Sequence, residues 1–262
     1  MKLAAQEGMI PGKSLKEKFA NLEEYGFEGI EFWGKGIVER EKEIIQASSQ
    51  SSVKVSTICA GYEGCLLSDK KEERERAIKD IETLLKVASN IGAEGLIVVP
   101  IFGPPRLPDL SPWMEIKELE RKILIEELKR IGEVAEKVNS LCLLEPLNRY
   151  ETHFLNRLEE AVEICKEVSS RGVKIMADFF HMNIEEKKID EAIKKAEGFI
   201  YHIHLADSTR LLPGYGHTDF KSGFSALKET GYDKYMALEC GIPGKPEEDL
   251  PKCVKYLREC GA

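Results

Sequence analysis

Short hydrophobic runs alternate with longer amphipathic segments along the whole chain. Each run is short enough for one buried strand, and the runs cover residues 2–6, 27–33, 53–60, 95–102, 141–145, 173–178, 199–204 and 235–239. The segments between them carry apolar residues three or four positions apart, the spacing of a helix with one buried face. Helices are expected from about residue 14 and over residues 39–50, 70–91, 115–139, 157–170, 187–197, 222–230 and 247–260. The pattern predicts eight strand-then-helix units.

Eight such units in 262 residues are about 33 residues long each, close to the length of a βαβ unit. Strict alternation favours a parallel sheet with right-handed crossovers, and eight units favour a closed (β/α)8 barrel. No break in composition divides the chain, so we expect an α/β fold with a single TIM barrel domain over residues 1–262. An open doubly wound sheet is the alternative, but no glycine-rich phosphate turn follows the first strand.

The long connections follow predicted strands, over residues 61–69, 103–114, 147–156 and 206–221. In such barrels the reacting groups lie at the C-terminal ends of the strands, on the same side as these connections. Three prolines stiffen residues 103–109, and we expect this loop to form part of a cover over the site. Three aromatic residues are candidates to line or cover a pocket there, namely Trp33, Phe102 and Trp113.

Four consecutive predicted strands end in a side chain that binds metals, namely Glu145, Asp178, His204 and Glu239. Three carboxylates and one imidazole form an oxygen-rich set that suits Mn²⁺ best, with Mg²⁺ or Co²⁺ as alternatives. A single buried acid would more simply pair with a lysine or arginine. Three acids at one depth, with only Lys174 as a nearby cation in these strands, would leave unpaired buried charge. The pattern therefore predicts one divalent-metal site.

Alternation along the strands also predicts the layer below the metal site. Residues two positions earlier share the same side of each strand. We expect this layer to contain Leu143, Met176, His202 and Ala237 at matching depth.

The second half of the chain resembles the ketose 3-epimerases (D-tagatose, D-psicose and L-ribulose 3-epimerases) within the xylose isomerase-like TIM barrels. The first half is similar only in general layout. The resemblance is carried by four segments: Glu145-Pro-Leu-Asn-Arg-Tyr-Glu151, Asp178-Phe-Phe-His-Met-Asn-Ile-Glu-Glu186, His202-Ile-His204 with the run Arg210-Leu-Leu-Pro-Gly-Tyr-Gly216, and Glu239.

The resemblance implies an enzyme that inverts C3 of a ketose of the D-tagatose, D-psicose, D-fructose or L-ribulose type. It implies a metal held by Glu145, Asp178, His204 and Glu239. Two of these ligands, Glu145 and Glu239, would also remove and return the proton, through a metal-stabilised enediolate. Substrate contacts are implied for Glu151, His181 and Arg210. Family members are commonly homodimers or homotetramers, and we expect the same here.

Three other functions use similar residues. An aldose–ketose isomerase, of the sugar or hydroxypyruvate type, would use the same site but move the carbonyl between neighbouring carbons. An endonuclease IV-like DNA repair enzyme would bind three zinc ions with further histidines on earlier strands, whereas all five histidines here follow residue 150. A barrel that binds a sugar or metal without catalysis would lack one of the required carboxylates, and none is missing.

Composition narrows the choice of partners. The formal net charge is -8 with a pI of about 5.4, which argues against a nucleic-acid partner because such binding depends on neutralising phosphates. No apolar run is long enough for a membrane span, and the N-terminus does not resemble a signal peptide. Seven cysteines without a Cys-x-x-Cys pair favour a reducing compartment. We expect a cytoplasmic enzyme with a small sugar as substrate.

Other polar residues have less certain places. Two interpretations stay open for Glu31: a contact to the sugar or to His181, or a paired acid of the core. We expect His202 to lie in the core or to support the ligands, and His153 to lie at the surface. The turn over residues 241–245 lies where barrels often bind phosphate, but a free ketose is the favoured substrate.

Overall fold

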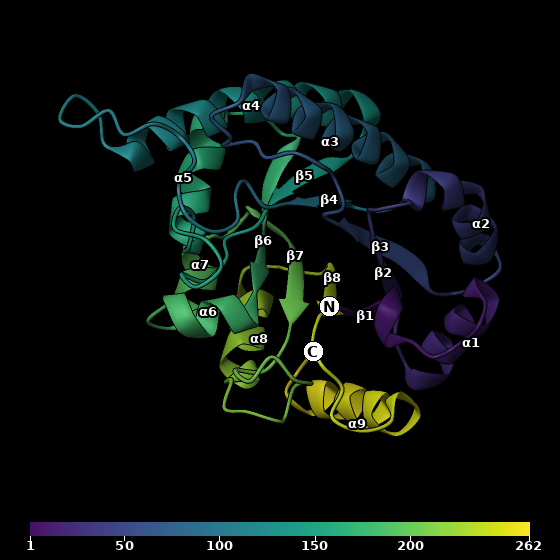
Figure 1. The fold of residues 1–262 in the computed structure, drawn as a ribbon. Helices are drawn as coiled ribbons and strands as arrows, with labels where there is room; N and C mark the ends of the chain where they lie inside the picture. The colour runs from purple at the N-terminus through teal and green to yellow at the C-terminus, as the bar shows by residue number, and fades with distance from the viewer.

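Eight parallel strands pair in sequence order and close on themselves, because β8 pairs with β1. The computed structural model describes all 262 residues (Figure 1). The strands are β1 (Lys2–Gln6), β2 (Gly29–Trp33), β3 (Lys54–Cys59), β4 (Gly95–Val98), β5 (Leu141–Leu144), β6 (Val173–Asp178), β7 (Ile200–Leu205) and β8 (Tyr235–Leu238). The TIM barrel expected from the alternating pattern is confirmed.

Helices surround the barrel, as Figure 1 shows. They are α1 (Leu15–Tyr25), α2 (Ile37–Ser49), α3 (Lys71–Ile91), α4 (Ile116–Val138), α5 (Leu158–Val168), α6 (Phe179–Glu185), α7 (Ile189–Lys195), α8 (Phe220–Glu229) and α9 (Pro246–Glu259). A 3-10 turn, η1 (Glu7–Met9), follows β1. Helix α6 was not expected from the sequence. It begins directly after β6, where the Asp178 side chain accepts a hydrogen bond from the backbone N–H of Phe180 and so caps it.

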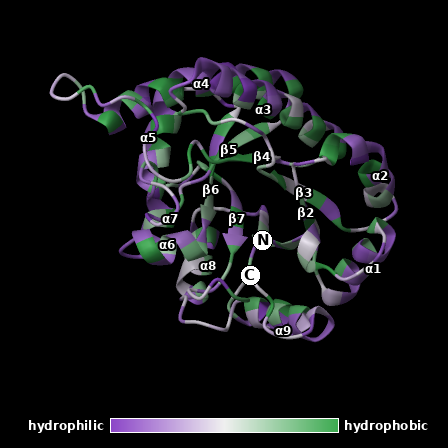
Figure 2. Cartoon of the chain, in the orientation of Figure 1, coloured by the Kyte–Doolittle hydropathy of each residue, from purple (hydrophilic) through white to green (hydrophobic).

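Local sequence explains where the helices begin and end. Helix α1 starts after Ser14, whose hydroxyl accepts a hydrogen bond from the backbone N–H of Glu17. It ends at Gly26, which has a φ of 86°, a left-handed conformation that glycine adopts without steric cost. Its apolar face is buried, at Leu15, Phe19, Leu22 and Tyr25. Figure 2 shows the same two-sided pattern in the outer helices, with polar residues on their outer sides.

The core has an outer and an inner part. The outer part fills the space between strands and helices and contains most of the buried apolar residues. The inner part lies inside the barrel, where Cys59, Ile97, Leu143 and Met176 pack together. Side chains of neighbouring strand residues point to opposite sides, so each strand contributes to both parts. The floor of the metal site is therefore a packed layer rather than an open pore.

The strand register shows how the four residues of the expected layer below the metal site are paired. Between β6 and β7 the expected layers are paired, as Met176–His202 and Asp178–His204. On the flanking ladders the pairing is shifted by two residues, to Leu143–Lys174 and His204–Ala237. Barrel strands tilt relative to the barrel axis, so residues at one height are displaced along the hydrogen-bond ladder. The two-residue shifts are therefore compatible with the expected layer, and Leu143 and Met176 of that layer do pack together inside the barrel.

The barrel mouth, defined here as the C-terminal ends of the strands, carries the long connections. One of them, between β4 and α4, projects beyond the ring of helices in Figure 1. In this connection the indole of Trp113 is 86% exposed. Trp113, one of the three aromatic candidates to line or cover the pocket, is therefore exposed rather than packed over the site. No helix has the length and apolar character needed to cross a membrane.

Candidate metal centre and active site

Three of the four predicted ligands meet at the barrel mouth. Glu145 follows β5, Asp178 ends β6 and His204 lies in β7. Each offers one ligand atom, and these atoms all lie within 4.8 Å of one another. All three residues are buried. This arrangement brings two carboxylates and an imidazole to one point, as a single divalent ion requires.

The two ring nitrogens of His204 have different surroundings. Its Nε2 lies 3.0 Å from both carboxylate oxygens of Glu31. Its Nδ1 is buried and has no hydrogen-bond partner, although it lies 3.2 Å from Oε2 of Glu239 and 3.9 Å from Oε1 of Glu145. A buried nitrogen without a partner is costly unless something binds it. Because Glu31 accepts the hydrogen on Nε2, Nδ1 is the ring nitrogen that a metal would bind in place of a proton.

Glu31 is the anchor of this arrangement and is fully buried. Besides His204, it accepts hydrogen bonds from the hydroxyl of Thr57 at 2.5 Å and from the amide of Gln6 at 3.0 Å. The Nε2 of His202 lies 2.8 Å away. Of the two interpretations for Glu31, the paired core acid agrees with these contacts. Sequence reasoning missed Gln6 and Thr57, whose only signal was that they face the barrel interior near strand ends.

Glu239, the fourth predicted ligand, lies beside this group. Its Oε1 accepts a hydrogen bond of 2.9 Å from the amide of Gln6. The guanidinium of Arg210 lies between Glu239 and Asp178 and bonds to both. Arg210 also stacks on Phe180, with its Cζ 4.8 Å from the ring centroid. Arg210 thus holds together two carboxylates that are candidate metal ligands.

Burial and neighbouring charges shift the pKa values of Glu145 and Glu239 in opposite directions. Burial raises the pKa of Glu145 well above its ordinary value. Burial acts the same way on Glu239, but His204 and Arg210 outweigh it and lower the pKa of Glu239. Burial opposes the charged form of His204 as well, yet the carboxylates of Glu31 and Glu239 raise its pKa well above normal. One carboxyl that favours its proton and another that favours ionisation form a possible acid–base pair.

Two of the three residues predicted to bind substrate, Glu151 and His181, form a second group next to the first. Asn148 connects them, because its Nδ2 lies 2.8 Å from both Oε1 of Glu151 and Nδ1 of His181. The backbone N–H of Asn148 also donates to Nδ1 of His181, at 3.3 Å. With Nδ1 accepting, the proton of His181 is on Nε2, which lies 3.6 Å from Oδ2 of Asp178. Sequence reasoning missed Asn148, although it lies inside the segment that carries the resemblance.

A cavity of about 290 Å³ opens at the ends of β2, β3 and β4. Trp33 and Phe102 line it, as expected, and both are half exposed. Arg106 and Lys35 add positive charge to its wall. The cavity therefore offers aromatic surface and cations beside the mouth.

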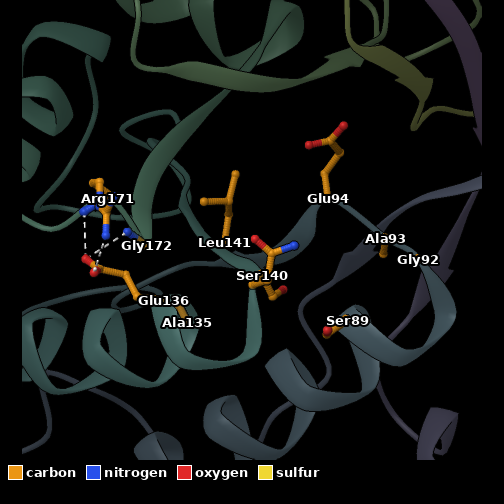
Figure 3. Close-up of a pocket in the computed structure, with 11 residues that line it drawn as sticks. Ser89, Gly92, Ala93, Glu94, Ala135, Glu136, Ser140, Leu141, Arg171 and Gly172 are labelled. Atoms are coloured by element: carbon orange, nitrogen blue, oxygen red, sulfur yellow. Dashed lines mark hydrogen bonds and ion pairs between the residues drawn. The ribbon is translucent and has the colours of Figure 1, made fainter.

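A larger cavity of about 580 Å³ lies at the opposite end of the barrel. It is formed by the turns that lead into β4, β5 and β6, and Figure 3 shows its lining residues. Glu136 there accepts hydrogen bonds from the backbone N–H groups of Arg171 and Gly172. These bonds hold neighbouring turns together at the end of the barrel opposite to the one where barrel enzymes carry their chemistry.

Comparison with known proteins agrees with this geometry. The family model described as "Xylose isomerase-like TIM barrel" matches residues 19–260. The chain belongs to this family. The 3-dehydro-D-guloside 4-epimerase of Escherichia coli K12 is 32% identical to this xylose isomerase-like barrel over 263 residues, covering 99% of this chain and 100% of that one. A D-psicose 3-epimerase of Enterocloster bolteae is 37% identical over 123 residues, 47% of this chain and 41% of that one.

A solved structure gives the same result in three dimensions. The 3-keto-D-glucoside 4-epimerase from E. coli superposes on this xylose isomerase-like barrel with a TM-score of 0.90 and 32% identity, over 99% of this chain and 100% of the other. The resemblance to the ketose 3-epimerases is confirmed by the family and by its named relatives. The chain is therefore an enzyme of a sugar epimerase family, with candidate metal-binding residues at its mouth.

Proposed function

We propose that the chain is a metal-dependent epimerase that inverts a carbon next to the ketone of a keto sugar. The observation that carries this proposal is the buried, unpartnered Nδ1 of His204, which faces the carboxylates of Glu145 and Glu239. We propose Glu145, Asp178, His204 and Glu239 as the ligands, and Mn²⁺ as the metal because the set is rich in carboxylate oxygen.

Epimerisation needs one group to remove the proton from the carbon beside the ketone and another to return a proton to the opposite face. Glu145 and Glu239 are the two carboxyls that would remove and return the proton. Each positioned acid or base of this kind typically increases the rate about 10²–10⁴-fold. A bound metal would supply Lewis-acid polarisation of the ketone and neighbouring hydroxyl oxygens. Arg210 and His181 place positive charge and an N–H donor where negative charge develops on oxygen. Glu151 orients the sugar by hydrogen bonds.

Two substrate classes fit this chemistry. One is a free ketose inverted at C3, as the D-psicose 3-epimerases suggest through matches to about half of the chain. The other is a 3-keto hexoside inverted at C4, which the relative from E. coli suggests through a match to nearly the whole chain. The cavity lined by Trp33 and Phe102 offers room for a substituent on the sugar. Both observations favour the keto hexoside, and the C3 epimerase stays the second candidate.

The test is a panel of ketoses and 3-keto hexosides, assayed after chelation and again after Mn²⁺ is added back. Solvent deuterium should enter the inverted carbon, which identifies it as C3 or C4. Glu145→Gln and Glu239→Gln should each lose most of the activity, whereas the exposed Glu43→Gln should not, because Glu43 lies 58% exposed on α2. Faster formation of an aldose than of an epimer would favour the isomerase instead. Full activity in excess chelator would refute the metal site.

We further propose that the enzyme is a single-domain, cytoplasmic homodimer or homotetramer. All seven cysteines are free in the structure, which agrees with a reducing compartment. Light scattering of the purified protein would measure the oligomeric state, and a monomer at micromolar concentration would contradict this part.

A further inference from the structure

The imidazole of His153 connects three parts of the chain beside the mouth. It lies in the connection after β5, and its Nδ1 is 2.8 Å from the carbonyl oxygen of Gly103, at the start of the connection after β4. Its Nε2 is 2.8 Å from both carboxylate oxygens of Glu120 in α4. Only 19% of the His153 side chain is exposed, so the expectation that it lies at the surface was wrong.

Both ring nitrogens of His153 face acceptors, a carbonyl and a carboxylate. The ring is therefore placed to form hydrogen bonds to the carbonyl of Gly103 and to the carboxyl of Glu120 at the same time. Glu120 is fully buried, and a buried carboxylate is costly without a charged or hydrogen-bonding partner. We call these three residues, Gly103, Glu120 and His153, the His153 clasp.

Further backbone bonds join the two connections at the clasp. The N–H of Gly103 donates to the carbonyl of Glu151 at 2.7 Å, and the N–H of His153 donates to the carbonyl of Gly103 at 3.2 Å. Gly103 has a φ of 76°, in the left-handed region that favours glycine. The backbone of Glu151 is thus held through Gly103, while its carboxylate is held by Asn148 at 2.8 Å.

We propose that His153 and Glu120 are positioning residues that fix Glu151 for the substrate and tie the connection after β4 to the mouth. This inference rests on the proposed function in one respect, the contact between Glu151 and the sugar. The half-exposed carboxylate of Glu151 has one side-chain donor, Asn148, so its position depends on its backbone. The side-chain contacts of His153 with Gly103 and Glu120 add to the backbone bonds that keep residues 151–153 beside Gly103.

The first test needs no substrate. Amide hydrogen exchange is compared between the wild-type protein, His153→Ala and His153→Gln, with His217→Ala as a matched control that removes an exposed imidazole from another loop. We expect exchange at residues 103–115 and 147–156 to rise together by about tenfold, the change that follows from losing a bond worth about 1.4 kcal/mol. His153→Gln keeps one donor and should show a smaller rise. Unchanged exchange in either segment would refute the clasp.

A double variant tests whether the pair acts as one unit. Glu120→Gln keeps the shape of the side chain but cannot carry its negative charge. This variant also tests the pair on its own if His153→Ala folds poorly. If His153 and Glu120 act together, His153→Ala/Glu120→Gln should exchange no faster than His153→Ala alone. Additive effects of the two substitutions would show that they act separately and would overturn the pairing.

The second test uses the reaction. With the substrate that the panel identifies, His153→Gln should raise KM about tenfold and change kcat by less than about threefold, because binding rather than proton transfer depends on the placement of Glu151. Affinity for Mn²⁺ should not change. A loss of Mn²⁺ affinity as large as the rise in KM would mean that the substitution disturbs the whole barrel mouth. The proposed positioning role of His153 would then be wrong. If no keto sugar reacts at all, the proposed function fails while the exchange result still decides the clasp.

Discussion

The Nε2 atom of His204 lies 3.0 Å from each carboxylate oxygen of Glu31. These residues belong to β7 and β2, which are not neighbours in the barrel, so the contact crosses its interior. It fixes the orientation of the imidazole and leaves Nδ1 facing Glu145 and Glu239. The ability of His204 to bind a metal therefore depends on a residue more than half the chain away in sequence.

Replacing Glu31 with glutamine should weaken metal binding. The amide offers only one oxygen to His204 and His202. The imidazole of His204 therefore loses the negative charge of Glu31 and one of the two contacts that orient it. Supporting residues of this kind typically change metal affinity by about 10–100-fold. Titration of the apoprotein with Mn²⁺, followed by electron paramagnetic resonance, measures this effect. Glu43→Gln is the matched control, and equal affinity in both variants would contradict the role of Glu31.

Replacing Arg210 with methionine should have opposite effects on metal binding and activity. The guanidinium bonds to Asp178 and Glu239, which are proposed ligands, so its charge competes with a cation for them. We expect Mn²⁺ to bind several-fold more tightly and the epimerase rate to fall by about 10²-fold, as when one donor to a developing oxyanion is removed. Arg210→Lys should recover little activity, because an ammonium group cannot form the two-pronged contact. Weaker Mn²⁺ binding in Arg210→Met would contradict this explanation.

Asp207 gives a stability effect that depends on pH. It accepts backbone hydrogen bonds from Ser208, Thr218 and Gly214 and so shapes the loop that carries Arg210. Burial opposes its ionisation, but these N–H groups outweigh burial and lower the pKa of Asp207. Because the pKa is lowered, ionised Asp207 stabilises the fold at every pH above the ordinary Asp pKa of about 3.9. This stabilisation is lost as the pH falls through the lower pKa of the folded protein.

Asp207→Asn should therefore lower the free energy of unfolding at pH 7 by about 2 kcal/mol, since an amide has one acceptor oxygen in place of two. Denaturant unfolding at several pH values measures this. The difference from the wild-type protein should begin to shrink below about pH 4, where Asp207 of the unfolded wild-type chain takes up a proton, and should shrink further as pH falls through the lowered pKa of the folded protein. A difference that stays constant from pH 7 to pH 3 would show that charge on Asp207 is not the cause.

Phe179 packs in the core between barrel and helices, next to the proposed metal ligand Asp178. It follows Asp178 directly, is fully buried and stacks on Phe220 with 5.6 Å between ring centroids. Phe179→Ala should lower the free energy of unfolding by about 3–5 kcal/mol through the cavity it leaves. Phe179→Leu should cost less because it fills more of that space. Thermal unfolding of both variants is the measurement, and a loss below about 1 kcal/mol for Phe179→Ala would mean that the helices close the cavity.

Much of the fold could be predicted from periodicity alone. Short apolar runs and helical spacing follow from local chain geometry, and eight alternating units have few ways to bury their apolar faces other than a closed barrel. Helix α6 was missed because its seven residues are too few to show a helical period in the sequence. The strand ends that carry Glu145, Asp178, His204 and Glu239 could also be recognised, because three carboxylates and an imidazole gathered at the ends of buried strands are costly without a cation to bind them.

The partners of those four residues could not be predicted in the same way. Gln6, Glu31 and Thr57 lie early in the chain, and only closure of the barrel and the tilt of its strands bring them next to His204 and Glu239. The same holds for His153, whose contact with Glu120 depends on how two loops and α4 meet. Local periodicity is enough to place the alternating elements and the side chains at the barrel mouth. Which of those side chains touch one another follows from the geometry of the closed barrel, because that geometry sets the contacts between distant strands.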